Sequence, residues 1–318
     1  MATVVVEHVS KAYQRGTVPA LRDMSFDVRS GELFGLIGPD GAGKTTLLRI
    51  LTTLLLADQG SARVADLDVV KDYHAIRRLV GYMPGRFSLY QDLSVAENLA
   101  FFATVFGTTV AANYHLVSDI YVQLEPFKQR LAGNLSGGMK QKLALCCALI
   151  HEPKVLFLDE PTTGVDPVSR KEFWDMLGRL RDRGITIVVS TPYMDEAARC
   201  DRVALVQHGQ IIALDSLPAM LASHATETFA VRGATGGPFH MLRDLRDYPF
   251  TKYCFAFGQE HHLVLLPNAP GGAAVEAYMR ERGHATVSVQ RIAPNIEDVF
   301  IELSQPPSAA TAKEQAHG

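Results

Sequence analysis

Hydrophobic runs and amphipathic segments alternate along the first part of the chain. The uninterrupted runs Val155–Asp159 and Thr186–Ser190 are typical of strands buried on both faces. Alternating apolar and polar positions predict two further strands, and helical periodicity predicts helices between the strands. The strands are expected over 3–9 and 24–28, and the helices over 44–55, 96–106, 137–150, 170–182 and 194–200. This order favours an α/β fold with a mostly parallel sheet, and the predominantly helical stretch 94–131 is expected to form a subdomain beside it.

After about residue 215 the pattern changes to strand, helix, two strands, helix and strand. These elements are expected over 228–231, 239–245, a hairpin 254–266 that turns near Gly258, 273–282 and 285–292, with a last helix 295–303 capped by Asn295. The order predicts a small α+β domain of the split βαβ type over 216–304. On the hairpin, His261 and His262 are expected to face solvent and not to bind a metal. Residues 305–318 lack periodicity and are expected to be disordered.

Composition limits the classes of protein to which the chain can belong. With 318 residues, 47% of them hydrophobic, the chain is long enough for one domain of about 200 residues and a smaller one. A net charge of −3 argues against a nucleic-acid partner. The amino-terminal residues lack the pattern of a signal peptide, and no apolar run is long enough to span a bilayer. We therefore expect a cytoplasmic protein whose four cysteines are reduced, buried thiols.

A glycine-rich loop follows an apolar run and precedes an amphipathic one. The segment 38–46 reads G-P-D-G-A-G-K-T-T, which matches G-x-x-x-x-G-K-T. Glycines let backbone N–H groups surround a phosphate, and the following helix adds the positive end of its dipole. Lys44 can reach the β- and γ-phosphates, and the Thr45 hydroxyl can bind Mg²⁺. The candidate nucleotide-binding residues are Tyr13, Gly38, Gly41, Gly43, Lys44, Thr45 and Thr46.

Two further segments carry candidate chemistry. Leu135–Gln141 reads L-S-G-G-M-K-Q and opens a predicted helix, so Ser136, Gly137 and Gly138 form a second anion-binding helix start. The strand Val155–Asp159 ends in Asp159 and Glu160, of which Asp159 can bind Mg²⁺ and Glu160 can polarise a water molecule. Taken singly, these segments also fit an ordinary helix cap and a strand end that reaches solvent.

The order and spacing of the three segments resemble the ATP-binding cassette family, the ATPase subunits of ABC transporters, over residues 3 to about 215. The resemblance implies a nucleotide-binding domain, 1–215, with a P-loop NTPase core. It also implies that Ser136, Gly137, Gly138 and Gln141 face the nucleotide of a second cassette across a head-to-tail dimer. Asp166 in G-V-D-P is then the residue that communicates across the dimer, and Tyr13 stacks on adenine.

The resemblance extends to the bacterial multidrug-exporter type, through the stretches 90–98, 193–197 and 295–303. It implies an ATPase subunit on the inner face of the membrane, separate from its permease. ATP binding then closes the two cassettes and drives the permease. Two other classes remain open: a nucleotide-binding regulatory subunit without turnover, and a soluble cassette protein that acts on ribosomes or DNA.

Two positions depart from the family pattern. Gly85 stands where the family places a glutamine that touches Mg²⁺ or the attacking water, and Pro192 stands where it places a histidine that contacts the γ-phosphate. Glycine has no side chain, and proline has no hydrogen-bond donor. The favoured interpretation is therefore a heterodimer in which this chain's own nucleotide site hydrolyses ATP slowly. The alternative is a homodimer whose sites still hydrolyse ATP.

Overall fold

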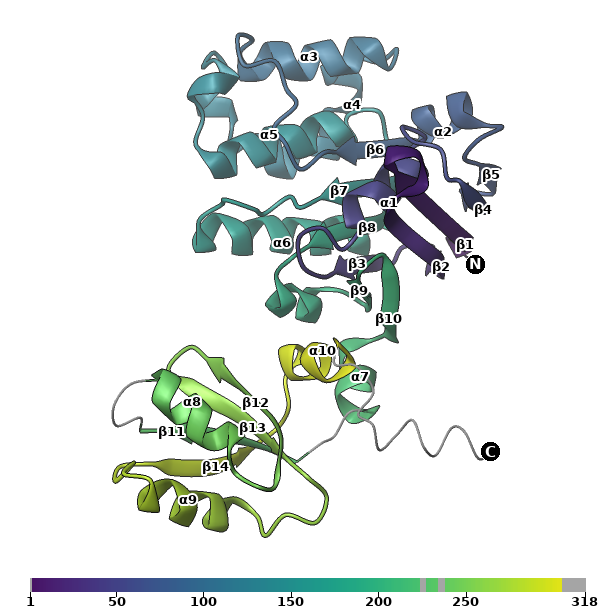
Figure 1. Cartoon of the computed structure of the whole chain (residues 1–318). Coiled ribbons are helices and arrows are strands. Elements are labelled where there is room, and N and C mark those ends of the chain that lie inside the picture. The colour runs from purple at the N-terminus through teal and green to yellow at the C-terminus, as the bar shows by residue number, and fades with distance from the viewer. Residues whose placement is uncertain (1, 224–226, 234–237, 305–318) are drawn as a thin grey trace. The chain divides into compact units, whose positions relative to one another are not determined.

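The structure is a computed structural model that describes residues 2–223, 227–233 and 238–304. The chain divides into two compact units, Met1–Leu217 and Pro218–Gly318, each of which is described by itself (Figure 1). The expected disordered tail, 305–318, lies outside the described residues.

The first unit is built on a six-stranded sheet. Its strand order is β10-β9-β3-β8-β7-β6, in which β10 is antiparallel to β9 and the other neighbours are parallel. The strands are β3 (Leu33–Ile37), β6 (Val80–Met83), β7 (Val155–Asp159), β8 (Thr186–Thr191), β9 (Arg202–Gln207) and β10 (Gln210–Asp215). Every residue of β3, β7 and β8 is buried, which confirms the prediction for the two uninterrupted hydrophobic runs.

A second, antiparallel sheet covers one face of the first. Its order is β2-β1-β4-β5, with strands β1 (Ala2–Tyr13), β2 (Val18–Arg29), β4 (Gln59–Val64) and β5 (Leu67–Asp68). The hydrophobic core between the two sheets also includes helix α1 (Lys44–Leu51). Strands β1 and β2 extend well beyond the predicted 3–9 and 24–28, because their pairing continues across several register shifts that sequence periodicity does not record.

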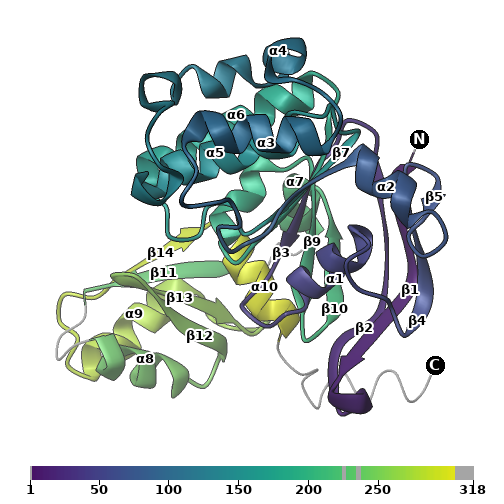
Figure 2. The ribbon, with the colours of Figure 1, turned by 90° about the horizontal axis from the view of Figure 1, so that it is seen from above.

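Helices cover the other face of the six-stranded sheet (Figure 2). They are α3 (Val95–Val105), α4 (Val110–Tyr121), α5 (Gly137–Leu149) and α6 (Pro167–Asp182), while α2 (Tyr73–Leu79) precedes β6 and α7 (Leu217–Ser223) begins where the first unit ends. Short 3-10 turns lie at Gln14–Gly16, Glu125–Phe127, Ala132–Asn134 and Met194–Arg199. The helices α3 and α4 confirm that 94–131 is predominantly helical.

Helix ends follow local chemistry. Helix α6 begins three residues before the predicted Arg170, because the Asp166 carboxylate accepts the backbone N–H groups of Val168 and Ser169 and Pro167 occupies the first turn. Helix α1 ends at Leu51, before the predicted residue 55, and Thr53 adopts a left-handed conformation with φ of 62°.

The second unit confirms the predicted α+β order. A four-stranded antiparallel sheet of order β12-β13-β11-β14 consists of β11 (Thr228–Arg232), β12 (Thr251–Phe257), β13 (Glu260–Leu265) and β14 (Ser288–Ile292). Its helices are α8 (Pro238–Arg246), α9 (Gly272–Glu281) and α10 (Ile296–Ser304). Gly258, with φ of 60°, lies in the turn between β12 and β13, and the Asn295 side chain accepts the Asp298 N–H and caps α10, both as predicted.

The expectation that His261 and His262 face solvent was wrong, since their exposed fractions are 2% and 3%. His262 Nδ1 lies 2.8 Å from Asp298 Oδ1 on α10, and its Nε2 lies 3.3 Å from Glu260 Oε1. Burial lowers the pKa of His262, but the hydrogen bonds to Asp298 and Glu260 outweigh burial and leave the pKa raised. Glu260 also binds Arg232, at 2.5 Å.

The buried His262–Asp298 pair predicts a pH dependence for the second unit. Because the folded-state pKa of His262 is raised, its stabilisation is complete below the unfolded pKa of about 6.5 and is lost as pH rises through the folded value. Replacing His262 by glutamine should remove this dependence and destabilise the unit by about 1–3 kcal/mol at low pH. Chemical denaturation of both forms between pH 5 and 9 measures the effect, and an unchanged pH slope would contradict the pairing.

Candidate nucleotide-binding site

The glycine loop connects β3 to α1 and forms a cradle that side chains would fill. A Cβ atom on Gly38 would lie 2.0 Å from the Val206 carbonyl oxygen, and one on Gly43 would lie 2.5 Å from that of Ala20. Gly41 and Gly43 have φ of 78° and 107°, which favour glycine, and Gly43 precedes the first residue of α1. The loop therefore requires glycine for close packing and for its turn, as a phosphate-binding loop does.

Lys44 lies across this loop with its side chain buried. Its Nζ donates to the carbonyl oxygens of Gly38 and Pro39, at 2.8 and 3.0 Å, and lies 3.6 Å from Glu160 Oε1. An ammonium group held over a backbone cradle provides a positive charge for a phosphate. Two residues further along α1, the Thr46 hydroxyl lies 3.2 Å from the Tyr13 hydroxyl, and Tyr13 is 38% exposed. The structure therefore brings Tyr13 to the first turn of the helix that Lys44 begins.

The end of β7 places Asp159 against the start of α1. Asp159 Oδ1 accepts from the Thr45 hydroxyl at 3.0 Å and from the Ser190 hydroxyl at 2.6 Å. A carboxylate and a hydroxyl at this separation are the ligands that Mg²⁺ takes beside a nucleotide, and the pair fits that ion. Thr45 and Asp159 would hold Mg²⁺, which offsets the negative charge of the phosphate oxygens.

Glu160 departs from the strand that carries Asp159. Its φ of 49° lies in the left-handed region, and its N–H lies 3.0 Å from both the carbonyl and the hydroxyl oxygen of Ser190. This strained turn directs the Glu160 side chain towards Lys44, while Oε2 accepts from the Thr163 hydroxyl at 3.4 Å. Two adjacent carboxylates thereby face different partners, as separate metal-binding and base functions require.

The signature residues lie at the amino-terminal end of α5. The Ser136 hydroxyl accepts the Met139 N–H at 3.3 Å and caps this helix, and a Cβ on Gly138 would lie 2.6 Å from the Ser169 hydroxyl on α6. Among the described residues, no hydrogen bond or ion pair joins 136–141 to Lys44, Asp159 or Glu160. Within one chain the signature residues therefore form a group of their own, and the expectation that they face the nucleotide of a second cassette stays a prediction.

Asp166 caps α6, as described above, and is exposed. The backbone hydrogen bond from Ser169 is the main cause of its lowered pKa, since it stabilises the charged form of the carboxylate. Within one chain, Asp166 caps α6. Its expected function in communication across a dimer stays a prediction.

Gly85 and Pro192 both lie beside this site. A Cβ on Gly85 would be 3.1 Å from the Asp159 carbonyl oxygen and 3.8 Å from its Oδ2, so the position faces the carboxylate without a side chain. Pro192 follows the last residue of β8, and the Tyr193 N–H donates to the Thr191 hydroxyl across it at 3.1 Å. Sequence reasoning missed Ser190 as a partner of Asp159 and Glu160, although a serine at the end of a buried strand next to β7 was a usable signal.

The four cysteines are free thiols, and within the described residues no group of histidine, cysteine and acidic side chains could hold a metal by itself. Burial raises the pKa of Cys254 to about 12, which makes it unreactive. None of the helices among the described residues combines the length and the hydrophobicity that a membrane-spanning segment needs.

Comparison with known proteins identifies the fold and the family. A family model described as ABC transporter matches residues 21–163. "Doxorubicin resistance ATP-binding protein DrrA" of Mycobacterium tuberculosis is 36% identical over 96% of this chain and 94% of its own length. The chain belongs to the ATP-binding proteins of the ABC transporter family. We call the whole chain, with both of its units, the cassette.

Other relatives agree with this assignment. "Probable multidrug ABC transporter ATP-binding protein YbhF" of Escherichia coli is 37% identical over 95% of the cassette, which spans only 52% of that relative's length. "Nod factor export ATP-binding protein I" of a Rhizobium species is 32% identical over 96% of the cassette and 98% of its own length.

Solved structures confirm the P-loop ATPase fold. The ATP-binding subunit of an ABC transporter superposes with a TM-score of 0.63 at 26% identity, covering 70% of the cassette and 92% of that structure. A cassette described as a dimer in a post-hydrolysis state, bound to ADP and Pi, has a TM-score of 0.61 at 24% identity and covers 67% and 98% of the two chains.

Proposed function

We propose that this cassette is the ATP-binding subunit of an exporter and lies on the inner face of a membrane beside a separate permease. The relatives named above are described by multidrug transport, doxorubicin resistance and Nod factor export. In this proposal MgATP binds at Lys44, Thr45 and Asp159, and a second cassette closes over the nucleotide. The observation that carries it is the buried Lys44 beside the Asp159–Glu160 pair.

The separation of the motifs supports a dimer. Ser136 caps α5 and has no hydrogen bond to the cassette's own Lys44 among the described residues, so this anion-binding helix start would serve the nucleotide of another subunit. Asp166 is exposed at the start of α6 and would lie at the same interface.

The second cassette is proposed to be a different chain. Gly85 and Pro192 replace polar side chains of the family pattern on the nucleotide side only, while Ser136, Gly137, Gly138 and Gln141 keep the signature that serves the partner. The cassette's own ATP would then be held and hydrolysed slowly, because positioning and charge stabilisation dominate phosphoryl transfer. The second unit, 216–304, would assist dimerisation or regulation.

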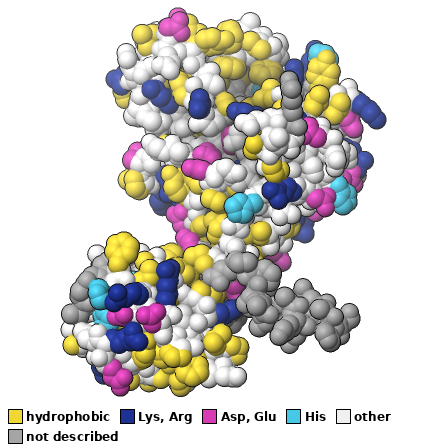
Figure 3. All heavy atoms as spheres, viewed as in Figure 1, with side chains coloured by type: hydrophobic (Ala, Val, Ile, Leu, Met, Phe, Trp, Pro, Cys, Tyr) yellow, Lys and Arg dark blue, Asp and Glu magenta, His cyan; other side chains and the backbone are white. Residues whose placement is uncertain are grey.

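A groove in the first unit suits a helix of the permease. It has a volume of about 360 Å³, and most of its lining surface is apolar, with Phe87, Phe102 and Ala144 among its residues. The lining also includes Pro84 and Arg86, on either side of Gly85, so one segment links the groove to Asp159. On the face in Figure 3, hydrophobic side chains lie over the helical subdomain at the top, and charges of both signs are interspersed.

A charge placed in the groove tests this function. Replacing Ala144 by glutamate should reduce binding to membranes that contain the permease at least about tenfold, because the carboxylate would be buried against apolar surface. The same change at Ala100, exposed on α3 and outside the groove, is the matched control. Cosedimentation measures binding, and fluorescent-nucleotide titration should show unchanged ATP affinity in both variants.

Two results would overturn the proposal. Equal membrane binding by both variants, or none by the wild-type cassette beside its permease, would favour a soluble cassette protein that acts elsewhere. ATP binding without any turnover in the full assembly would favour a regulatory subunit.

A further inference from the structure

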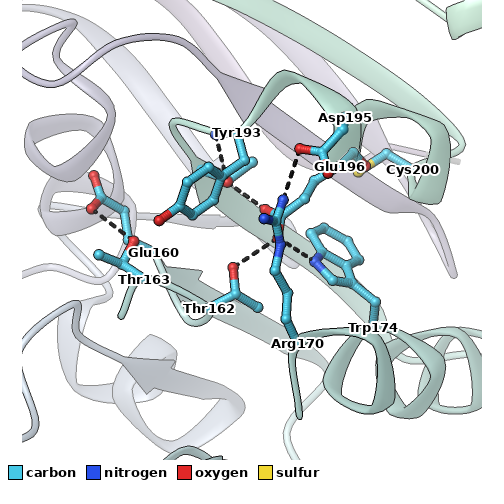
Figure 4. Close-up of polar contacts among 10 residues, drawn as sticks. Glu160, Thr162, Thr163, Arg170, Trp174, Tyr193, Asp195, Glu196 and Cys200 are labelled. Atoms are coloured by element: carbon cyan, nitrogen blue, oxygen red, sulfur yellow. Dashed lines mark hydrogen bonds and ion pairs between the residues drawn. The ribbon is translucent and has the colours of Figure 1, made fainter. Parts of the chain in front are cut away.

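A buried carboxylate outside the glycine loop organises the turn that contains Pro192. Glu196 is 2% exposed and accepts hydrogen bonds from side chains on three separate segments (Figure 4). Its Oε1 accepts from Thr162 at 2.8 Å, from Arg170 Nε at 2.6 Å and from Trp174 Nε1 at 2.7 Å. Its Oε2 accepts from the Thr191 hydroxyl. We call this cluster the Glu196 latch.

The charge in the latch is compensated by one arginine. Arg170 binds Asp195 as well, at 2.7 Å, and its guanidinium lies 4.1 Å from the centre of the Tyr193 ring. A buried carboxylate is costly unless it is paired and hydrogen-bonded, and here both conditions are met. The latch therefore holds its members in one arrangement.

Thr191 connects the latch to the turn. Its hydroxyl donates to Glu196 and accepts the Tyr193 N–H at 3.1 Å. Because the Thr191 hydroxyl proton is directed at Glu196, a lone pair of the Thr191 oxygen is directed at the Tyr193 N–H. Pro192 itself has neither a backbone N–H nor a polar side chain. The hydrogen bond across Pro192 therefore depends on Thr191.

The same segment touches the nucleotide site on its other side. The Thr191 carbonyl accepts the Gly38 N–H, at 3.2 Å, where the glycine loop begins. Ser190, one residue earlier, donates to Asp159 and accepts from the Glu160 N–H. Thr162 lies two residues after Glu160, so the latch holds both strand ends that bear on the carboxylate pair.

We propose that Glu196 is a positioning residue of the nucleotide site, which acts through Thr191 to hold Ser190 and thereby the metal-binding carboxylate of Asp159. The inference rests on the proposed MgATP site. It assigns a purpose to side chains that contact neither the glycine loop nor its lysine, and it explains how the turn stays ordered although proline replaces a donor.

Magnesium-dependent nucleotide binding tests the latch without requiring turnover. In the full-length chain, the ratio of ATP affinity with Mg²⁺ to that with EDTA should fall about tenfold for Thr191→Val and for Glu196→Gln. Thr191→Ser keeps the hydroxyl and should restore the wild-type ratio. Thr104→Val removes a hydroxyl that binds Ala100 within α3 and serves as the matched control. Thermal unfolding of each variant is recorded alongside.

The outcomes separate the latch from the magnesium site. If Thr191→Val lowers the melting temperature but leaves the ratio of ATP affinities unchanged, the latch is merely structural. The same conclusion follows if Thr191→Ser lowers this ratio as much as Thr191→Val does. If the wild-type chain binds ATP equally well with Mg²⁺ and with EDTA, the proposed metal site is contradicted, and with it the function assigned to Glu196.

Discussion

Replacing Lys44 by alanine is expected to lower ATP affinity by about 100-fold or more. Lys44 is 3% exposed, and it donates to the carbonyl oxygens of Gly38 and Pro39. Among the described residues, no other cationic side chain donates to these two oxygens. Charge-assisted hydrogen bonds to a phosphate in a desolvated cradle are among the strongest polar contacts, and each tenfold of affinity corresponds to about 1.4 kcal/mol.

The control for this change lies next to the strand that carries Asp159. Lys154 is exposed just before β7 begins, so Lys154→Ala removes the same charge at the opposite end of that strand. Fluorescent-nucleotide titration and the rise in melting temperature with ATP measure binding independently. Equal affinity in the two variants would mean that nucleotide binds elsewhere.

Ser136→Ala is expected to lower ATP turnover of the assembled transporter by about 100-fold, and Glu160→Gln by less than about threefold. The difference follows from the proposed asymmetry. Ser136 would complete the competent site on the partner cassette, whereas Glu160 belongs to a site with no side chain at position 85 and no hydrogen-bond donor at position 192. Steady-state ATP hydrolysis by the reconstituted complex measures both effects.

Ser118→Ala serves as the control for the serine change, because the Ser118 hydroxyl donates to the His115 carbonyl within α4. Both substitutions abolishing turnover to the same extent would contradict the asymmetry and favour a symmetric homodimer. Loss with Glu160→Gln alone would place hydrolysis at the cassette's own site.

Predictions from the sequence succeeded where the determining contacts are local. Asn295 caps α10 because its side chain reaches an N–H three residues away. The strand Val155–Asp159 is buried on both faces, and its uninterrupted run of hydrophobic residues predicted this burial. Helix ends were less accurate, since the start of α6 is decided by the Asp166 cap and the end of α1 by a left-handed residue.

Burial of polar groups was the main failure. His262 reads as a solvent-facing residue of a hairpin, and it becomes buried because α10, folding back from a distant part of the chain, brings Asp298 to its ring. Glu196 gave a similarly weak signal, since an acidic residue in a polar segment is usually exposed. Its donors come together only through the packing of α6, β8 and the segment that follows β7.

The glycine loop, the carboxylate pair, the signature and the departures at Gly85 and Pro192 can all be read from the order of residues, because motif spacing is a property of neighbouring residues. Which of these groups contact one another depends on the fold. Ser190 joins Asp159 across 31 positions, and Glu196 joins Thr162 across 34. Such contacts depend on how strands and helices pack, since parallel strands bring distant segments to one edge of a sheet.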